Sequence, residues 1–285
     1  MKINKVTKQH KHYPSYFKEI AHPPKELSFI GESLEGYLPA VTIVGSRKLS
    51  SYGKDVTYRL AFDLAKQGIT IISGLALGAD GIAHQAALDA GGRTIAVLAC
   101  GLNEIYPASH RNLAIDILKQ GGTIISEYPE GTPALKQNFI ARNRLVSALS
   151  DFVIITEAAE ASGSLITANF ALEQNKQVGA VPGPITSSLS TGTNNLLKSG
   201  AHVITSAEDV LNVLGLQAEE SARNEVFGDT KEEQLIIDIM QEGITELDQI
   251  QAKSKLEPST FSQSFTMLEI SGKIRPLGAA HWTLR

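Results

Sequence analysis

The stretch AVTIVGSRKLSSYGKDVTYRLAFDLAKQGITIISG, residues 40–74, contains a complete unit of strand, helix and strand. Its first and last segments, AVTIVG (40–45) and ITIISG (69–74), are apolar and β-branched without alternation, which is typical of strands buried on both faces. The segment between them, DVTYRLAFDLAKQG (55–68), has helical periodicity and ends in a glycine, a favoured helix C-cap. This order predicts a parallel sheet covered by helices.

The same pattern repeats up to residue 214. Further helical runs end at Gly91, Gly121 and Gly200, and they alternate with the apolar runs TIAVLACG, TIISE, DFVIITE, QVGAVPG and AHVIT. We therefore predict that residues 39–214 form an α/β domain with an extended Rossmann-like, doubly wound, mostly parallel sheet of about seven strands.

Both ends of the chain differ from this pattern. Residues 1–38 have little periodicity and contain the pair Pro23 and Pro24, so we predict an N-terminal arm. Its five lysines up to Lys18 are available to a polyanion, and a solvated tail is the simpler interpretation. Residues 215–230 are polar and acidic and predict a linker.

The segment 231–285 is expected to form a small C-terminal domain. Its pattern predicts three helices and a hairpin (GKIRPLGAAHWTL), with helices near 231–241, 245–252 and 258–271. This winged-helix-like order suggests DNA binding, but from Asp229 onward six Lys and Arg face nine Asp and Glu. Because duplex-binding helices usually present a basic face, the charge favours a protein-contact or structural role.

Composition excludes several classes of protein. The 285 residues carry a net charge of −4, so a polyanion must be held locally rather than by a generally basic surface. The single cysteine, Cys100, excludes an intramolecular disulfide framework and a cysteine-based zinc cage. No apolar run of about 18 residues and no secretory signal is present, so we expect a cytoplasmic protein without a membrane span.

The loops after the strands are the expected ligand positions, because ligands bind at the carboxyl ends of strands in doubly wound sheets. The first such loop, GSRKLSSYG (45–53), lacks the dinucleotide fingerprint. Its backbone amides and the fork of Arg47 suit a phosphate, which makes Gly45, Ser46 and Arg47 candidate ligands. The alternative is that Arg47 is a surface residue or an ion-pair partner.

The second loop, SGLALGADGIAH (73–84), begins with the candidates Ser73 and Gly74. Asp80 and His84 share a helix face four residues apart, but no third metal ligand accompanies them. We expect an internal hydrogen bond between their side chains.

The fourth strand is followed by SEYPEGTPALKQNFIARNRLVSAL, in which no acidic residue occurs between Gly131 and Ser150. Basic residues can hold phosphates there while an aromatic face stacks on a base. Alternatively, the aromatic belongs to the core and the arginines pair with distant acids. The candidate residues are Lys136, Phe139, Arg142, Asn143 and Arg144.

Two further loops add small and hydroxyl-bearing residues before helices. They supply the candidates Gly163, Ser164, Thr167, Gly183, Gly192, Thr193 and Asn194. Together these loops predict a row of anion-binding amides along one sheet edge. No catalytic carboxylate pair, Ser–His–Asp set or Walker lysine is apparent among them.

Seven blocks, in order, resemble the signature of the DNA-processing protein A family over roughly residues 30–214. They are VTIVGSRKLSSYG, IISGLALGADGIAHQAAL, GGRTIAVLACGLNEIYP, ISEYPEGT, NFIARNRLVSALSDFVIITEA, SGSLITANFALEQNKQVGAVPG and GTNNLLKSGA. Many members also append a winged-helix domain.

The resemblance implies a homodimeric cytoplasmic protein that binds and protects single-stranded DNA and loads RecA recombinase on it during natural transformation. It also implies a protein that is not an enzyme and has no cofactor. By motif, Arg47 is similar to the family's phosphate-binding arginine. Lys136 and Phe139 match a K-x-x-F spacing for phosphate and base contact, and residues 142–144 match the R-N-R block. Ile140 and Ala141 stand where members often have proline shortly before that block.

Two other functions remain as alternatives. Nucleotide phosphoribohydrolases of the lysine-decarboxylase-like group share this layout, but their P-G-G-x-G-T-x-x-E block is absent, and Glu157 and Glu160 are the nearest acids. A sequence-specific duplex reader would use the C-terminal domain, against its acidic balance.

Overall fold

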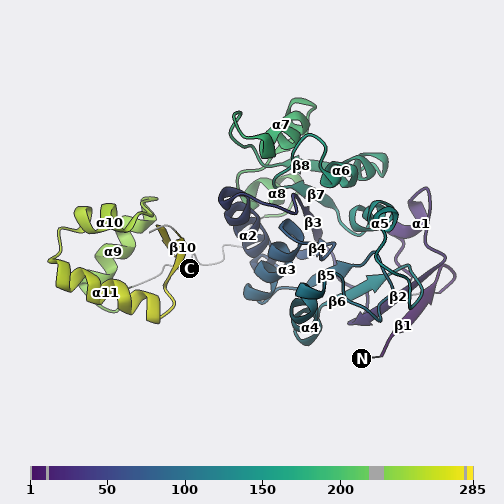
Figure 1. Cartoon of the computed structure of the whole chain (residues 1–285), viewed down its shortest axis with the longest axis horizontal. Helices are drawn as coiled ribbons and strands as arrows, with labels where there is room; N and C mark the ends of the chain where they lie inside the picture. Colours follow the sequence, from purple (N-terminus) through teal and green to yellow (C-terminus); the bar gives the residue numbers. More distant parts are fainter. Residues whose placement is uncertain (1, 11–12, 218–227, 279–280, 285) are drawn as a thin grey trace. The chain divides into compact units, whose positions relative to one another are not determined.

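The computed structural model describes residues 2–10, 13–217, 228–278 and 281–284. The chain divides into two compact units, Met1–Glu219 and Glu220–Arg285 (Figure 1). In the ranges described, no helix is long and apolar enough to cross a membrane.

The described part of the first unit is built on a nine-stranded sheet with the order β1-β2-β6-β5-β4-β3-β7-β8-β9. The strands that pair in parallel confirm the predicted fold class: β3 (Ala40–Val44), β4 (Thr70–Ser73), β5 (Thr94–Val97), β6 (Thr123–Ser126), β7 (Phe152–Ile155), β8 (Gln177–Ala180) and β9 (His202–Val203). Val41 lies opposite Ile71 on one side and Phe152 on the other, so β3 is central.

The segment interpreted as an N-terminal arm is part of this sheet. Strands β1 (Asn4–Thr7) and β2 (Glu26–Gly31) extend it in antiparallel fashion next to β6. Phe17 in helix α1 (Tyr16–Glu19) and Leu27 are fully buried in the main core. The arm interpretation failed because an antiparallel edge shows neither the repeated helix nor the long apolar runs of the parallel strands.

Successive strand residues point to opposite faces of the sheet, and each face has its own core. Ile72 belongs to the cluster under α5 (Lys136–Ala148) and α6 (Gly163–Glu173), whereas Ile71 belongs to the cluster under α2 (Ser51–Lys66), α3 (Ala79–Asp89) and α8 (Ala207–Val213). Helix α4 (Arg111–Lys119) covers the β5–β6 part of that second face. Each fully buried isoleucine contributes about 1.5–3 kcal/mol of transfer free energy.

Gly78 fixes the position of the loop after β3. It has a φ of +81°, and a Cβ at this position would overlap the carbonyl oxygen of Ser46. The amide of Ala79 also donates to that oxygen at 3.2 Å. The start of α3 is therefore packed directly against the Ser46–Arg47 backbone.

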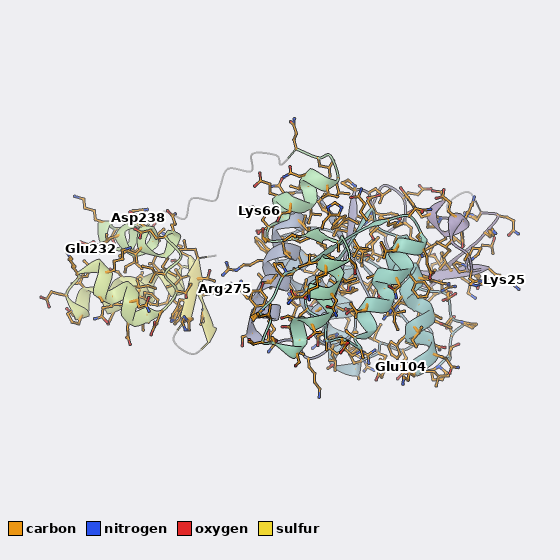
Figure 2. All side chains as sticks on the ribbon, turned by 90° about the horizontal axis from the view of Figure 1, so that it is seen from above. Lys25, Lys66, Glu104, Glu232, Asp238 and Arg275 are labelled. Carbon is orange, nitrogen blue, oxygen red and sulfur yellow. The ribbon has the colours of Figure 1, made fainter. Side chains whose placement is uncertain are left out.

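The second unit has the winged-helix order expected from its sequence. Helices α9 (Lys231–Gln241), α10 (Leu247–Ser254) and α11 (Pro258–Ile270) precede the hairpin strands β10 (Ile274–Gly278) and β11 (His281–Leu284). Trp282 packs edge-on against Phe265 at a centroid separation of 5.1 Å. Figure 2 shows the acidic side chains of Glu232 and Asp238 on α9. Most of the predicted linker, residues 218–227, lies outside the described residues.

Candidate functional site

A cavity of about 570 Å³ opens where the strand order reverses between β3 and β7. Crevices at such switch points are the usual ligand positions of doubly wound sheets. The candidates from the sequence that line it are Gly45, Arg47, Lys136, Phe139, Arg142, Asn143, Gly163, Ser164 and Thr167. The structure therefore brings together residues from the loop after β3 and from helices α5 and α6.

Arg47 and Phe139 form the centre of this cavity wall. The guanidinium carbon of Arg47 lies 5.0 Å from the Phe139 ring centroid, within the range of a cation–π contact. The ring of Tyr106 contacts the Phe139 ring in a tilted arrangement, with the centroids 5.5 Å apart and an angle of 58° between the ring planes. Lys136 lies one helical turn before Phe139, at the start of α5. Arg47 and Lys136 are exposed, and the described residues place no carboxylate within ion-pair distance of either.

Arg142 plays a different part from the one expected. It is 3% exposed, and its guanidinium donates to the carbonyl oxygens of Gly74 (2.7 Å) and Val97. Burial lowers the pKa of Arg142 and raises that of Asp80, and the attraction between the two opposes both shifts. Arg142 therefore ties together the ends of β4 and β5 and does not offer a free fork to a phosphate.

Gly74 has a packing role for the same reason. A Cβ at this position would lie 2.5 Å from a guanidinium nitrogen of Arg142. Gly74 was expected to be a DNA ligand, but the structure shows that a glycine is needed here to leave space for the Arg142 guanidinium.

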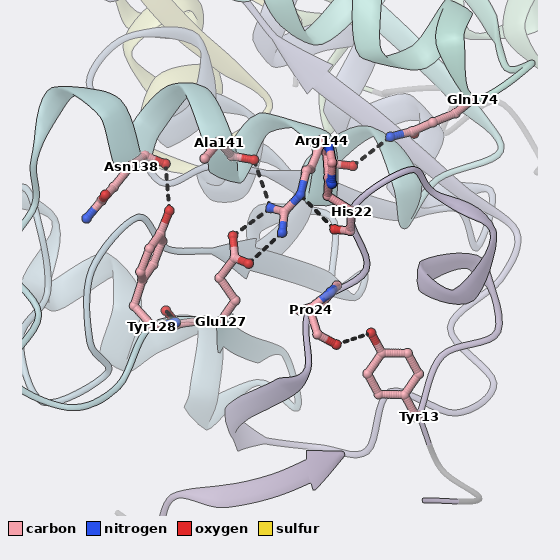
Figure 3. A network of polar contacts seen from close by, with 10 residues as sticks. Tyr13, His22, Pro24, Glu127, Tyr128, Asn138, Ala141, Arg144 and Gln174 are labelled. Atoms are coloured by element: carbon pink, nitrogen blue, oxygen red, sulfur yellow. Dashed lines mark hydrogen bonds and ion pairs between the residues drawn. The ribbon is translucent and has the colours of Figure 1, made fainter. Parts of the chain in front are cut away.

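Arg144 is also engaged within the fold, contrary to the expectation that it holds a phosphate. Its guanidinium makes two bonds of 2.6 Å to the carboxylate of Glu127, and its Nε donates to the carbonyl oxygen of His22 at 3.0 Å (Figure 3). Its side chain is only 14% exposed. The acid lies just upstream of the acid-free stretch, so a search of that stretch alone missed it. The alternative of distant ion pairs therefore holds for Arg144.

Asp80 and His84 do not bond to each other as expected. The Asp80 carboxylate accepts from the amides of Gly74 (3.1 Å) and Ala76 (3.3 Å). His84 Nδ1 lies 2.7 Å from the Thr94 hydroxyl, which donates to a backbone carbonyl and therefore accepts from the imidazole. Burial lowers the pKa of His84 to about 3.

Several other candidates hold the loops rather than line the cavity. The Ser46 hydroxyl accepts from the amide of Lys48 (3.0 Å), and the Ser73 hydroxyl donates to a carbonyl oxygen of β3 (2.7 Å). Asn194 bonds both backbone groups of Gly183, at 3.2 and 3.0 Å. The Thr193 hydroxyl donates to the Ser190 carbonyl oxygen. A Cβ on Gly192 would lie 2.7 Å from the carbonyl oxygen of Ala159.

Sequence reasoning missed Tyr106 and Ser162 as cavity residues. Tyr106 is 46% exposed and lines the cavity, and the only signal for it was its place in the block GLNEIYP after a strand. Ser162 caps α6 by accepting from the amide of Ser164 at 3.4 Å, and it lines the cavity as well.

Glu157 is used inside the fold. It is 3% exposed, and its carboxylate accepts from the amide (2.8 Å) and the hydroxyl (2.6 Å) of Ser50, at the start of α2. A carboxylate held in this way anchors a helix and is poorly placed to attack a substrate.

Comparisons with known proteins agree on one relationship. The family model described as DNA recombination-mediator protein A matches residues 4–215, and a model of the DprA winged helix domain matches residues 205–279. Protein Smf of Escherichia coli K12 is 45% identical over 202 residues, which are 71% of this chain and 54% of that protein. DNA processing protein DprA of Bacillus subtilis is 41% identical over 213 residues, which are 74% of this chain and 71% of that one. The chain thus spans about half the length of the E. coli relative.

Two solved structures are similar in fold as well as in sequence. DNA processing protein A from Streptococcus pneumoniae has a TM-score of 0.70 and 39% identity, covering 74% of each chain. The protein of that name from Helicobacter pylori, solved to describe its single-stranded DNA binding mode, has a TM-score of 0.67 and 37% identity. That comparison covers 74% of this chain and 95% of the other.

Proposed function

This chain belongs to the DNA recombination-mediator protein A family, and from this premise we propose that it binds single-stranded DNA at the cavity between β3 and β7. The observation that carries the proposal is the contact of Arg47 with Phe139. Lys136, for which the described residues supply no ion-pair partner, lies one turn away on α5.

The chemistry of this cluster suits an unpaired strand. The guanidinium of Arg47 provides a fork for phosphate oxygens, and Lys136 provides a second charge on a flexible stem. The rings of Phe139 and Tyr106 offer faces to bases that are free of a duplex. Such stacking stabilises binding by about 1–3 kcal/mol per base and tolerates any sequence.

The relative from H. pylori supports the same ligand. Its structure concerns a single-stranded DNA binding mode, and 95% of that chain is covered by the similarity. The first unit contains the whole cavity, so we assign strand binding to Met1–Glu219 and a protein-contact or structural role to the acidic second unit.

We further propose that the bound strand is protected and passed to RecA recombinase during natural transformation, by a homodimer in the cytoplasm. The family's description as a recombination mediator supports this role. RecA-dependent ATP hydrolysis on a single strand should begin sooner when this protein is present, and light scattering should give twice the mass of one chain. If the delay before RecA-dependent ATP hydrolysis is unchanged, the RecA-loading part of the proposal is wrong, whereas the proposal of strand binding is not affected.

The protein is proposed to act by binding, without catalysis and without a cofactor. The rival nucleotide-hydrolysing activity would require a reactive acid, whereas the carboxylate of Glu157 is committed to Ser50. Incubation with nucleoside monophosphates tests this directly, because release of free base would establish the rival function.

A titration on oligo-dT and on a duplex of equal length tests the proposed ligand. The single strand should bind more tightly, because its bases are free to stack on the rings of Phe139 and Tyr106, whereas the bases of a duplex are already stacked on one another. Equal affinities for the two would contradict the proposal.

A further inference from the structure

A second hollow, of about 580 Å³, shares Arg47 with the cavity. Its wall includes Lys48 from the same loop, Lys54 from the first turn of α2, Leu77 from the loop before α3, and His110 from the turn before α4. We call this hollow the lysine groove. Apart from Arg47, its lining residues are not among those assigned to strand binding from the sequence.

The charge of the lysine groove is of one sign. Lys48 and Lys54 are exposed, and no Asp or Glu is among the described residues that line it. Neither lysine forms an ion pair within the described ranges, in contrast to Lys119 and Lys253, which are paired with Asp116 and Glu242. Uncompensated cations in a concave surface raise the local concentration of an anionic ligand.

The groove has few groups that could read the edge of a base. The amide nitrogen of Gln85 already donates to Asp89 at 2.8 Å, and His110 Nδ1 lies 3.0 Å from the Leu75 carbonyl oxygen. Leu77 adds an apolar surface that is 48% exposed. Cations beside an apolar surface suit a phosphodiester backbone with no particular sequence.

Arg47 connects the two hollows at a fixed point. Its loop is held by the packing of Gly78 against Ser46 and by the bond from the Ser46 amide to the Glu157 carbonyl oxygen (2.7 Å). If Arg47 binds one phosphate of a strand, the nucleotides on one side of that phosphate lie in the cavity, and those on the other side lie in the lysine groove.

We propose that the lysine groove binds the phosphates of nucleotides that flank those held in the cavity, so that the strand passes over Arg47 from one hollow to the other. This inference rests on the proposed function and defines the path of the strand. It requires affinity to depend on the length of the strand, because a short oligonucleotide fills only the cavity.

The test compares the double variant K48Q/K54Q with wild type on oligo-dT of about five and about twenty nucleotides. The matched control is K66Q/K198Q, which removes the same charge from exposed lysines that line neither hollow. For the longer strand, K48Q/K54Q should lower affinity on the order of tenfold at 0.1 M salt and reduce the log–log salt slope by about 1.4, or 0.7 per lost phosphate contact. Its affinity for the short strand should equal that of wild type, and the control should match wild type on both.

The outcomes separate the two proposals. If wild type binds neither strand, the proposed function fails and this inference fails with it. If wild type binds but K48Q/K54Q matches the control on the longer strand, the strand path is wrong while the proposed function stands. The melting temperatures of both double variants should equal that of wild type, because the replaced side chains are exposed, and this measurement checks that the variants are folded.

Discussion

The guanidinium of Arg47 lies 5.0 Å from the ring centroid of Phe139, which joins the loop after β3 to the first turns of α5. The pair unites a phosphate ligand and a stacking surface in one wall of the cavity. Phe139 is partly exposed, whereas Phe152 in β7 is fully buried. The two phenylalanines are therefore expected to differ in what they stabilise.

Truncation of these rings should separate binding from folding. Phe152→Ala should lower the free energy of unfolding by about 3–5 kcal/mol, the usual cost of removing a core phenylalanine. Phe139→Ala should cost less, because part of its ring is already in water. Urea denaturation of both variants measures the difference, and equal losses would assign Phe139 to the core.

Replacement of Arg144 should affect stability and leave strand binding largely unchanged. Arg144→Ala leaves the largely buried Glu127 carboxylate without its two bonds, which should cost about 1–3 kcal/mol. The Glu127→Gln variant serves as the matched control, and a double-mutant cycle isolates the pair. If a folded Arg144→Ala protein shows a reduced log–log salt slope for binding to oligo-dT, Arg144 contacts DNA and this prediction is wrong.

Acid should destabilise the protein through His84. Burial lowers its folded pKa to about 3, against 6.5 for the ordinary imidazole, so below pH 6.5 the unfolded chain binds a proton that the folded chain does not. Stability from this group is fully present above pH 6.5 and falls by about 1.4 kcal/mol per pH unit down to about pH 3. Asp80 acts in the opposite sense, since its pKa is raised by burial.

The contribution of His84 to stability is therefore measured by comparing wild type with the His84→Gln variant. Urea denaturation from pH 7 to pH 5 should show a steeper loss for wild type than for His84→Gln. Parallel curves for the two proteins would show that His84 is not the group responsible.

Removal of residues 229–285 should leave most of the single-strand affinity in place. The cavity belongs entirely to the first unit, and the removed segment carries a net charge of −3. Fluorescence anisotropy on oligo-dT compares the truncated and full-length proteins. Near-complete loss of binding by a folded truncated protein would make the second unit a primary DNA binder.

The parallel part of the fold could be predicted because its strands are apolar on both faces and its helices end in glycine. Gly68, Gly91, Gly121 and Gly200 all have positive φ. Strands β1 and β2 could not be predicted from the same signal, because an antiparallel edge strand such as β1 buries only Val6 among its residues.

The site was predictable in its residue types and less so in their roles. Arg47, Lys136 and Phe139 lie together because the loop after β3 and the first turns of α5 line the same cavity. The role of Arg142 depends on the carbonyl oxygens of Gly74 and Val97, and that of Arg144 depends on the carboxylate of Glu127. These partners come from other segments of the chain, so only the tertiary structure shows the contacts. Tyr106 joins the site through a contact across the fold that no local spacing encodes.

The salt dependence of single-strand binding by Arg47→Ala and Phe139→Ala tests the central claim most directly, with Lys66→Ala as a control for the loss of an exposed charge. Arg47→Ala should weaken binding and reduce the log–log slope by about 0.7, the value for one lost phosphate contact. Phe139→Ala should lower affinity by about 1–3 kcal/mol with the slope nearly unchanged, since stacking involves no counterion. Wild-type affinity and slope in a folded Arg47→Ala protein would contradict the account.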